Sequence, residues 1–191
     1  MGEPTLSVPD SIIPLAGFRR WAVPYGEDTF GRPPYTLVTR GHSWPVGEPM
    51  KAKCIIPWNP LGQCFKESPP SPHCDCGIYA HHEIDRGEYY RSSSGAQKSV
   101  FGSCIGWGRV YFDNRWWRAE YCKPIAFADP RDTERHMLTK WVYETVDWLE
   151  GVAEKYKVPI LPRREIEEYT YQYGAVWKVP RLTDDEEEAR K

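Results

Sequence analysis

The 191-residue sequence lacks the segments that mark membrane and secreted proteins. No apolar run approaches the roughly 20 residues that a membrane-spanning helix needs. Residues 1–13 carry Glu3, Pro4, Pro9 and Asp10 in place of the basic and then apolar regions of a signal peptide. We therefore expect a cytoplasmic protein, in which cysteine thiols stay reduced and clustered cysteines bind metal more often than they form disulfides.

The sequence also lacks an excess of either charge. It has 25 basic and 27 acidic side chains and a net charge of -2. No overall field therefore favours nucleic acid or an anionic membrane, and any contact with nucleic acid has to be local.

Motifs of the common enzyme classes are missing as well. There is no G-x-S-x-G, P-loop, dinucleotide-binding glycine pattern or H-E-x-x-H. A zinc deaminase places H-x-E before P-C-x-x-C, whereas here His81 and His82 follow a C-x-C. A non-enzymatic protein is therefore the favoured class.

Proline and aromatic residues are abundant, with 18 Pro, 9 Trp and 12 Tyr. This mixture favours short strands and defined turns over a helical bundle. The length suits one domain. We expect an N-terminal extension over residues 1–16, a single α+β domain over 17–180 that is β-rich over 17–128 and helical over 129–174, and an acidic tail over 181–191.

Three elements are predicted from local patterns. Residues 100–112 and 116–127 are rich in β-branched and aromatic side chains and flank Asp113-Asn114, which predicts a hairpin with Cys104 and Cys122 nearly opposite one another. Asp129-Pro130 followed by apolar residues at helical spacing predicts an amphipathic helix that Val158-Pro159 ends. A shorter helix is expected over residues 163–173, before Gly174, with Ile166, Tyr169 and Tyr173 on one face. A last strand is expected over residues 175–179.

The cysteines suggest a metal site. Cys54, Cys64, Cys74 and Cys76 supply four thiolates within 23 residues, the number that a closed tetrahedral zinc site requires. Gly77 would adopt a positive φ and turn backbone amides toward the sulfurs. His73, or His81 and His82, are alternative ligands in place of one cysteine, and buried free thiols or disulfides remain the other interpretations. Cys104 and Cys122 lie in apolar strands, which favours burial over a redox pair.

Two further groups of residues are candidates for function. His81, His82 and Glu83 would suit an open metal site in a hydrolase, although their polar surroundings favour an exposed loop. Trp116, Trp117 and Arg118 follow the hairpin turn, where alternation sends one tryptophan inward and the other outward with Arg118. An exposed Trp beside Arg is typical of protein interfaces, and with Arg109 and Arg115 it would also suit single-stranded nucleic acid.

The sequence contains a C-x-C-G-[IL]-Y-A core at Cys74–Ala80, followed by Trp107-Gly108-Arg109-Val110 and by Arg118-Ala119-Glu120-Tyr121. In these motifs it resembles a set of uncharacterised proteins from actinobacteria and their phages. A W-P-x-G-x-x-x-x-A-x-C stretch ending at Cys54 and the later Tyr156-Lys-Val-Pro159 fit the same pattern. The resemblance implies an actinobacterial or phage source and no particular activity. It also implies a histidine between the first cysteine and the C-x-C, a place that Cys64 takes here.

These observations lead to three functional expectations. The first is a zinc-stabilised interaction protein, plausibly a phage product that binds a bacterial host protein, with structural zinc and a cytoplasmic location. The second is a nucleic-acid-binding protein that uses the Arg- and Trp-rich hairpin over residues 107–121. The third is a metal-dependent hydrolase. The α+β fold would be a small antiparallel sheet or partly open barrel with a zinc-stabilised loop and two C-terminal helices packed on one face.

Overall fold

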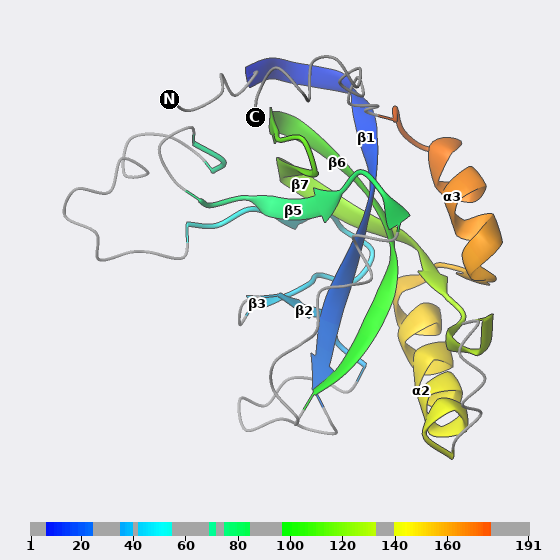
Figure 1. Ribbon diagram of the computed structural model, residues 1–191. Coiled ribbons are helices and arrows are strands. Elements are labelled where there is room, and N and C mark those ends of the chain that lie inside the picture. The colour runs from blue at the N-terminus through cyan, green and yellow to red at the C-terminus, as the bar shows by residue number, and fades with distance from the viewer. Residues whose placement is uncertain are drawn as a thin grey trace, which may run out of the picture.

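The computed structural model describes residues 7–24, 35–39, 42–54, 69–71, 75–84, 97–132 and 140–176. In this part of the chain the fold is α+β, with a mixed sheet and two helices (Figure 1). The strands are β1 (Ser7–Pro24), β2 (Val38–Thr39), β3 (His42–Ser43), β4 (Met50–Lys51), β5 (Ile78–His81), β6 (Gln97–Phe112), β7 (Trp116–Ala128) and β8 (Ile160–Leu161). The helices are α2 (Lys140–Tyr156) and α3 (Arg163–Tyr171), and a 3-10 turn, η2, covers Pro130–Asp132.

The predicted hairpin is confirmed. Strands β6 and β7 pair in antiparallel register from Phe112↔Trp117 outward, around the turn at Asp113-Asn114. Two register shifts interrupt the ladder. They place Cys104 opposite Pro124 and Cys122 opposite Gly106, so that the two cysteines are diagonal neighbours rather than a direct pair.

Four strands close into a ring of hydrogen-bonded pairs. Strand β1 pairs with β6, β6 with β7, β7 with β5, and β5 again with β1 through Phe18↔His81. The short strands flank this ring: β2 and β3 extend from β1, and β4 and the parallel β8 pair with β7. The sheet is therefore mixed rather than purely antiparallel, and the ring is close to the expected barrel.

The indole of Trp117 fills the space beside two strands of this ring. Its side chain is fully buried, and its Nε1 donates a hydrogen bond to the carbonyl of Ala16 at 3.0 Å. A Cβ atom on Gly17 or Gly106 would lie 2.7 or 2.3 Å from the indole ring. These two positions therefore need glycine, because a real Cβ would overlap the ring.

The two helices cover opposite faces of the sheet. Helix α2 buries Leu149 and Val152 in the larger core, which contains Trp21, Val100 and Phe127. Helix α3 buries Ile166 in a second core with Phe18, Phe101 and Ala126. Successive residues of a strand point to opposite faces of the sheet. Val100 and Phe127 lie in the first core, and their neighbours Phe101 and Ala126 lie in the second, so the two cores are on opposite faces. The expectation that both helices pack on one face is therefore wrong.

Helix α2 confirms the predicted amphipathic pattern where the structure describes its side chains. Leu149, Val152 and Tyr156 are buried, and the helix ends before Val158-Pro159 as expected. The Tyr156 hydroxyl donates to the carbonyl of Trp44 at 2.9 Å and accepts from the amide of Leu37 at 3.0 Å. Burial raises the pKa of Tyr156 to about 12. This hydroxyl ties the chain around β2 to the helix.

Other boundaries differ from the expectations. Strand β1 begins at Ser7, so residues 7–16 belong to the sheet and are not an extension outside it. The buried face of α3 carries Ile166 and Thr170, whereas Tyr173 lies beyond the helix and is exposed. Ala175 forms a bridge with Leu15. At the expected helix start, Asp129-Pro130, the structure has the 3-10 turn η2 rather than α-helix. Residues 133–139, residues 177–179 and the acidic tail lie outside the described residues.

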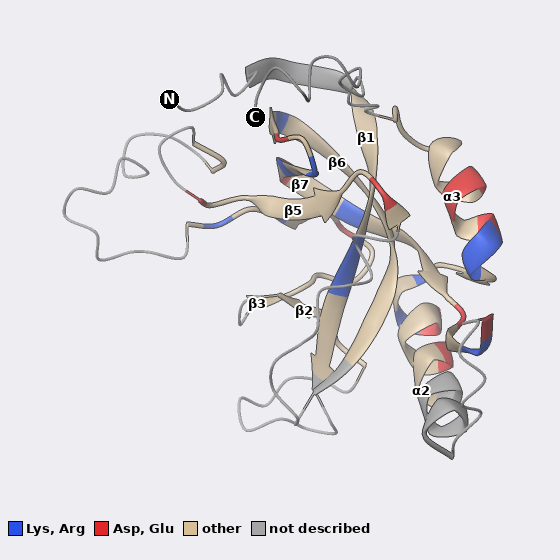
Figure 2. Ribbon diagram, viewed as in Figure 1, with Lys and Arg blue, Asp and Glu red and all other residues tan. Residues whose placement is uncertain are grey.

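Charges of both signs lie along α3 (Figure 2), in keeping with the balanced composition. Neither α2 nor α3, the two helices of the described residues, is long and apolar enough to cross a membrane.

Candidate functional site

The two ends of the proposed metal loop, residues 54–76, meet at one point on β7. Before the loop, the amide of Ala52 donates to the carbonyl of Glu120 at 2.7 Å. After the loop, Ile78 pairs with Ala119, the neighbour of Glu120. Cys54 lies two residues after Ala52, and Cys76 lies two residues before Ile78. The sheet therefore holds the two ends of the segment with the four predicted zinc ligands at neighbouring residues of β7.

The described cysteines of this loop differ in exposure. Cys76 is buried and Cys54 is half-buried, and neither forms a disulfide. Cys64, Cys74 and His73 lie outside the described residues. Within the described ranges no three His, Cys, Asp or Glu side chains come together as a metal site. Two of the four predicted sulfur ligands can thus be placed, and the donor chemistry at this point fits zinc.

Arg118, on β7, contacts the end of the loop at Cys76. Its Nη1 donates to the carbonyl of Cys76 at 3.0 Å, and its guanidinium lies 4.9 Å from the ring centroid of Tyr111. The prediction of a positive φ at Gly77 is confirmed, with a value of 127°. A Cβ there would lie 3.1 Å from Cβ atoms of Arg118 and Pro70. The backbone after Cys76 therefore packs closely on a buried cation.

His82 has a structural position. It is buried, its Nε2 donates to the carbonyl of Asp113 at 3.0 Å, and its ring stacks on Phe112. Burial lowers the pKa of His82. The expectation of an exposed loop is wrong for this residue, because its imidazole fastens β5 to the hairpin turn. Among the residues described, His81, His82 and Glu83 do not converge on a shared metal position.

Only some residues of the predicted binding surface are exposed. Trp117 and Arg118 are buried, at 0% and 5% exposure, so the expectation that they contact a partner is wrong. The ring of strands encloses Trp117, and the end of the metal loop covers Arg118. Arg115 is exposed, and Trp116 is half-buried with its ring centroid 4.9 Å from that of Tyr79. The prediction that one tryptophan points inward and the other toward the surface is confirmed, but Arg118 is buried and not exposed beside the outer one.

Arg109 contacts the metal loop at a second point, the carbonyl of Pro70. It is half-buried, and its Nη1 donates to the carbonyl of Pro70 at 3.4 Å. Its amide donates to Glu120 Oε2 at 3.5 Å. Arg109 and Arg118 thus hold two separate points of the chain that leads to Cys76, which gives both arginines a local structural role.

An aromatic and cationic cluster near the metal loop was missed by the sequence analysis. Trp107 stacks on Tyr121 with centroids 6.0 Å apart, and Lys51 Nζ lies 5.4 Å from the Tyr121 ring. Lys51 also lies 3.7 Å from a carboxylate oxygen of Glu120. Both aromatic side chains are half-buried. The pairing of β6 with β7 places the two rings together, and the pairing of β4 with β7 adds Lys51. Nothing in the local sequence signals the pairing of β4.

Cys104 and Cys122 are both buried free thiols, which confirms the prediction that they are buried. Burial raises the pKa of the Cys104 thiol, and the hydrogen bond with Cys122 raises it further. A thiol that stays protonated is a poor nucleophile and a poor metal ligand. These two cysteines therefore belong to the core.

Comparison with known proteins gave no guide to function. No protein-family model, no curated protein and no solved structure matches this chain. The geometry of the loop ends and of the residues around them therefore carries the functional argument.

Proposed function

We propose that the chain is a zinc-stabilised interaction protein. The observation that supports this proposal is that Ala52 and Ile78 bond to adjacent residues of β7, each two residues from a predicted ligand, Cys54 or Cys76. Cys64 and Cys74 would complete the ligand set, with His73 or His81 as a substitute for one of them. Zinc would cross-link a segment whose five prolines over residues 55–72 disfavour regular structure.

The surroundings suit a structural metal better than a catalytic one. Four thiolates fill a tetrahedral zinc site and leave no position for substrate. The Arg118 guanidinium near Cys76 would offset part of the negative charge of such a site. His82, which a hydrolase would need as an open ligand, is engaged with Asp113. The hydrolase alternative therefore has no supporting observation.

The surface beside the hairpin turn would contact the partner. Trp116 packs on Tyr79 and remains partly exposed, and Arg115 next to it is exposed. Half-exposed aromatic side chains beside arginine are enriched in binding hot spots. The likeness to proteins of actinobacteria and their phages supports a bacterial host protein as the partner.

The test is a pull-down from an actinobacterial lysate with the zinc-loaded protein. We expect one stoichiometric partner, which is lost on Trp116→Ala and retained on Tyr173→Ala. Tyr173 is a matched control because it is an exposed aromatic residue on another element. Trp117→Ala is unsuitable for this purpose, since it would open the core. Recovery of the same proteins by the wild type and by Trp116→Ala would reject this surface.

Nucleic-acid binding is the second candidate, and the Trp107–Tyr121 stack with Lys51 favours it. Aromatic faces and cations along a groove are the means by which single strands are bound without sequence preference. Binding of a single-stranded oligonucleotide should then weaken steeply with salt and be lost on Trp107→Ala. Absent or salt-independent binding would remove this candidate.

A further inference from the structure

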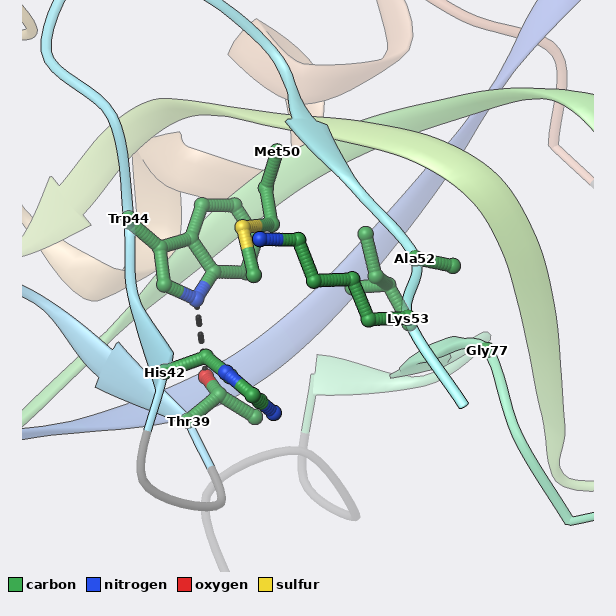
Figure 3. A pocket seen from close by; sticks show the side chains of 8 residues that line it. Thr39, His42, Trp44, Met50, Ala52, Lys53 and Gly77 are labelled. Atoms are coloured by element: carbon green, nitrogen blue, oxygen red, sulfur yellow. Dashed lines mark hydrogen bonds between the residues drawn. The ribbon is translucent and has the colours of Figure 1, made fainter. Parts of the chain in front are cut away.

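A small pocket lies where the metal loop leaves and rejoins the sheet (Figure 3). Its walls come from the strands β2 to β5 and from the residues next to them. Two of the lining residues, Lys53 and Gly77, are direct neighbours of the predicted ligands Cys54 and Cys76. The pocket is lined by Thr39, His42, Trp44, Met50, Ala52, Lys53, Gly77 and Ile78.

The inner part of the pocket is apolar and of defined size. Trp44, Met50, Ala52 and Ile78 are all buried members of the larger core. The Trp44 indole is held in place by a hydrogen bond from its Nε1 to Thr39 Oγ1 at 2.9 Å, drawn in Figure 3. The pocket volume is about 40 Å³, which is room for about three groups of the size of a water molecule or a methyl group. The valine side chain has three carbon groups and the leucine side chain has four, so the pocket has room for one branched aliphatic side chain of about this size.

The charge around the pocket has one sign. Of the described residues that line it, His42 and Lys53 can carry a positive charge and none carries a negative one. Lys53 is exposed and His42 is half-buried, so both are accessible from the solvent. A ligand that places a carboxylate next to its aliphatic group would complement both the wall and the rim.

Two strands beside the pocket, β3 and β4, lie at the two ends of the strand order. Each has a single strand neighbour within the described part of the chain. Edge strands can bind extended peptides, with side chains entering adjacent pockets.

We propose that this pocket binds one valine or leucine side chain from an extended acidic segment of a partner protein. The proposal rests on the proposed interaction function, and it names the chemistry of the partner. The apolar wall selects a branched aliphatic side chain, and Lys53 and His42 select the acidic residues next to it.

The test uses the methyl signals of methionine in the full-length, zinc-loaded protein. The chain has only three methionines, so labelling with methyl-¹³C methionine gives a spectrum in which Met50→Leu identifies the Met50 signal. The probes are the blocked peptide Gly-Asp-Leu-Asp-Gly, its Leu→Ala analogue and its Asp→Asn analogue. We expect a saturable shift of the Met50 signal, with the Ala peptide at least about tenfold weaker and the Asn peptide about threefold weaker.

Lys53→Gln provides the second arm. This exposed substitution should reduce the preference for the Asp peptide over the Asn peptide and leave the preference for Leu over Ala unchanged. Lys123→Gln, on β7 and outside the pocket lining, should retain both preferences. An unmoved Met50 signal, or equal binding of the Leu and Ala peptides, would overturn the proposal.

The results distinguish a failure of the pocket proposal from a failure of the proposed function. A silent Met50 signal together with a partner that is lost on Trp116→Ala would reject the pocket and leave the interaction function standing. A selective Met50 response in a protein that recovers no partner from lysate would support the pocket and reject the proposed hairpin surface.

Discussion

The guanidinium of Arg118 and the backbone carbonyl of Cys76 are joined by a buried hydrogen bond of 3.0 Å between residues 42 positions apart. Arg118 lies on the central strand β7, and Cys76 is the last predicted zinc ligand. The bond therefore connects the hairpin, which forms locally, to the metal loop, which depends on distant pairing. Its removal should affect the metal site before it affects the rest of the fold.

Arg118→Lys is expected to weaken zinc binding. Lysine keeps the charge but is a compact ammonium, which does not reproduce the planar guanidinium over Tyr111 or its reach to the carbonyl of Cys76. We expect a loss of about tenfold in zinc affinity, the lower end of the effect of removing a group that supports a metal ligand. Competition with a chromophoric zinc chelator measures it. Arg115→Lys, on the exposed turn, is the control, and equal affinities for the two variants would contradict the prediction.

Tyr156→Phe is expected to destabilise the fold by about 1–3 kcal/mol, since it leaves the buried Leu37 amide and Trp44 carbonyl without their hydroxyl partner. Urea unfolding followed by tryptophan fluorescence measures the change. The matched control is Tyr173→Phe, which removes only an exposed contact with Tyr169 and should change stability by less than about 0.5 kcal/mol. A similar, small effect of both substitutions would show that the Tyr156 hydroxyl does not fasten the β2 region to α2.

Gly106→Ala is expected to destabilise the protein by about 2–3 kcal/mol or to prevent folding. The new Cβ would lie 2.3 Å from the enclosed Trp117 ring, which has no space to move into. Gly47→Ala is the comparison, because Gly47 has a positive φ of 78° and nothing within 4 Å of its Cβ position. Its cost should be about 1 kcal/mol, from backbone strain alone. Thermal unfolding of both variants tests whether Trp117 packs this closely against Gly106. A smaller loss of stability for Gly106→Ala than for Gly47→Ala would contradict the prediction.

The stability of the protein is expected to fall on the acid side of neutrality through His82. Burial lowers the pKa of His82 in the folded protein, so the unfolded chain, with a pKa of about 6.5, binds the proton more readily. Stability is therefore full above about pH 6.5 and decreases as the pH falls below it. Denaturant unfolding at about pH 7.5 and about pH 5 should show a smaller loss for His82→Gln than for the wild type. Equal losses would mean that His82 does not contribute to the acid sensitivity.

Local patterns predicted the hairpin and the helices because their determinants are close in sequence. The turn at Asp113-Asn114 fixes β6 and β7, and the spacing of Leu149, Val152 and Tyr156 fixes the buried side of α2. The closure of the ring through Phe18↔His81 joins residues 63 positions apart, and no local pattern encodes it. The same holds for the opposite placement of α2 and α3, which depends on the path of the chain through β8.

The zinc chemistry of the candidate site stays a prediction from the sequence, whereas its surroundings come from the structure. Four cysteines in a proline-rich segment pointed to zinc, and Gly77 pointed to a turn after the last cysteine. Alternation suggested that one of Trp116 and Trp117 faces solvent, but it could not show that the loop ending at Cys76 covers Arg118. The pocket beside Lys53 depends on four short strands that meet only in the folded protein.

The most direct test of the central claim is the zinc content of the protein purified without added metal, measured by inductively coupled plasma mass spectrometry. The account predicts about one zinc per chain, lost on Cys54→Ser and on Cys76→Ser and retained on Cys122→Ala. A count of all six cysteines as free thiols in the denatured, metal-free protein should accompany it. A folded protein without zinc, or one that keeps its zinc after both Cys54→Ser and Cys76→Ser, would contradict the account.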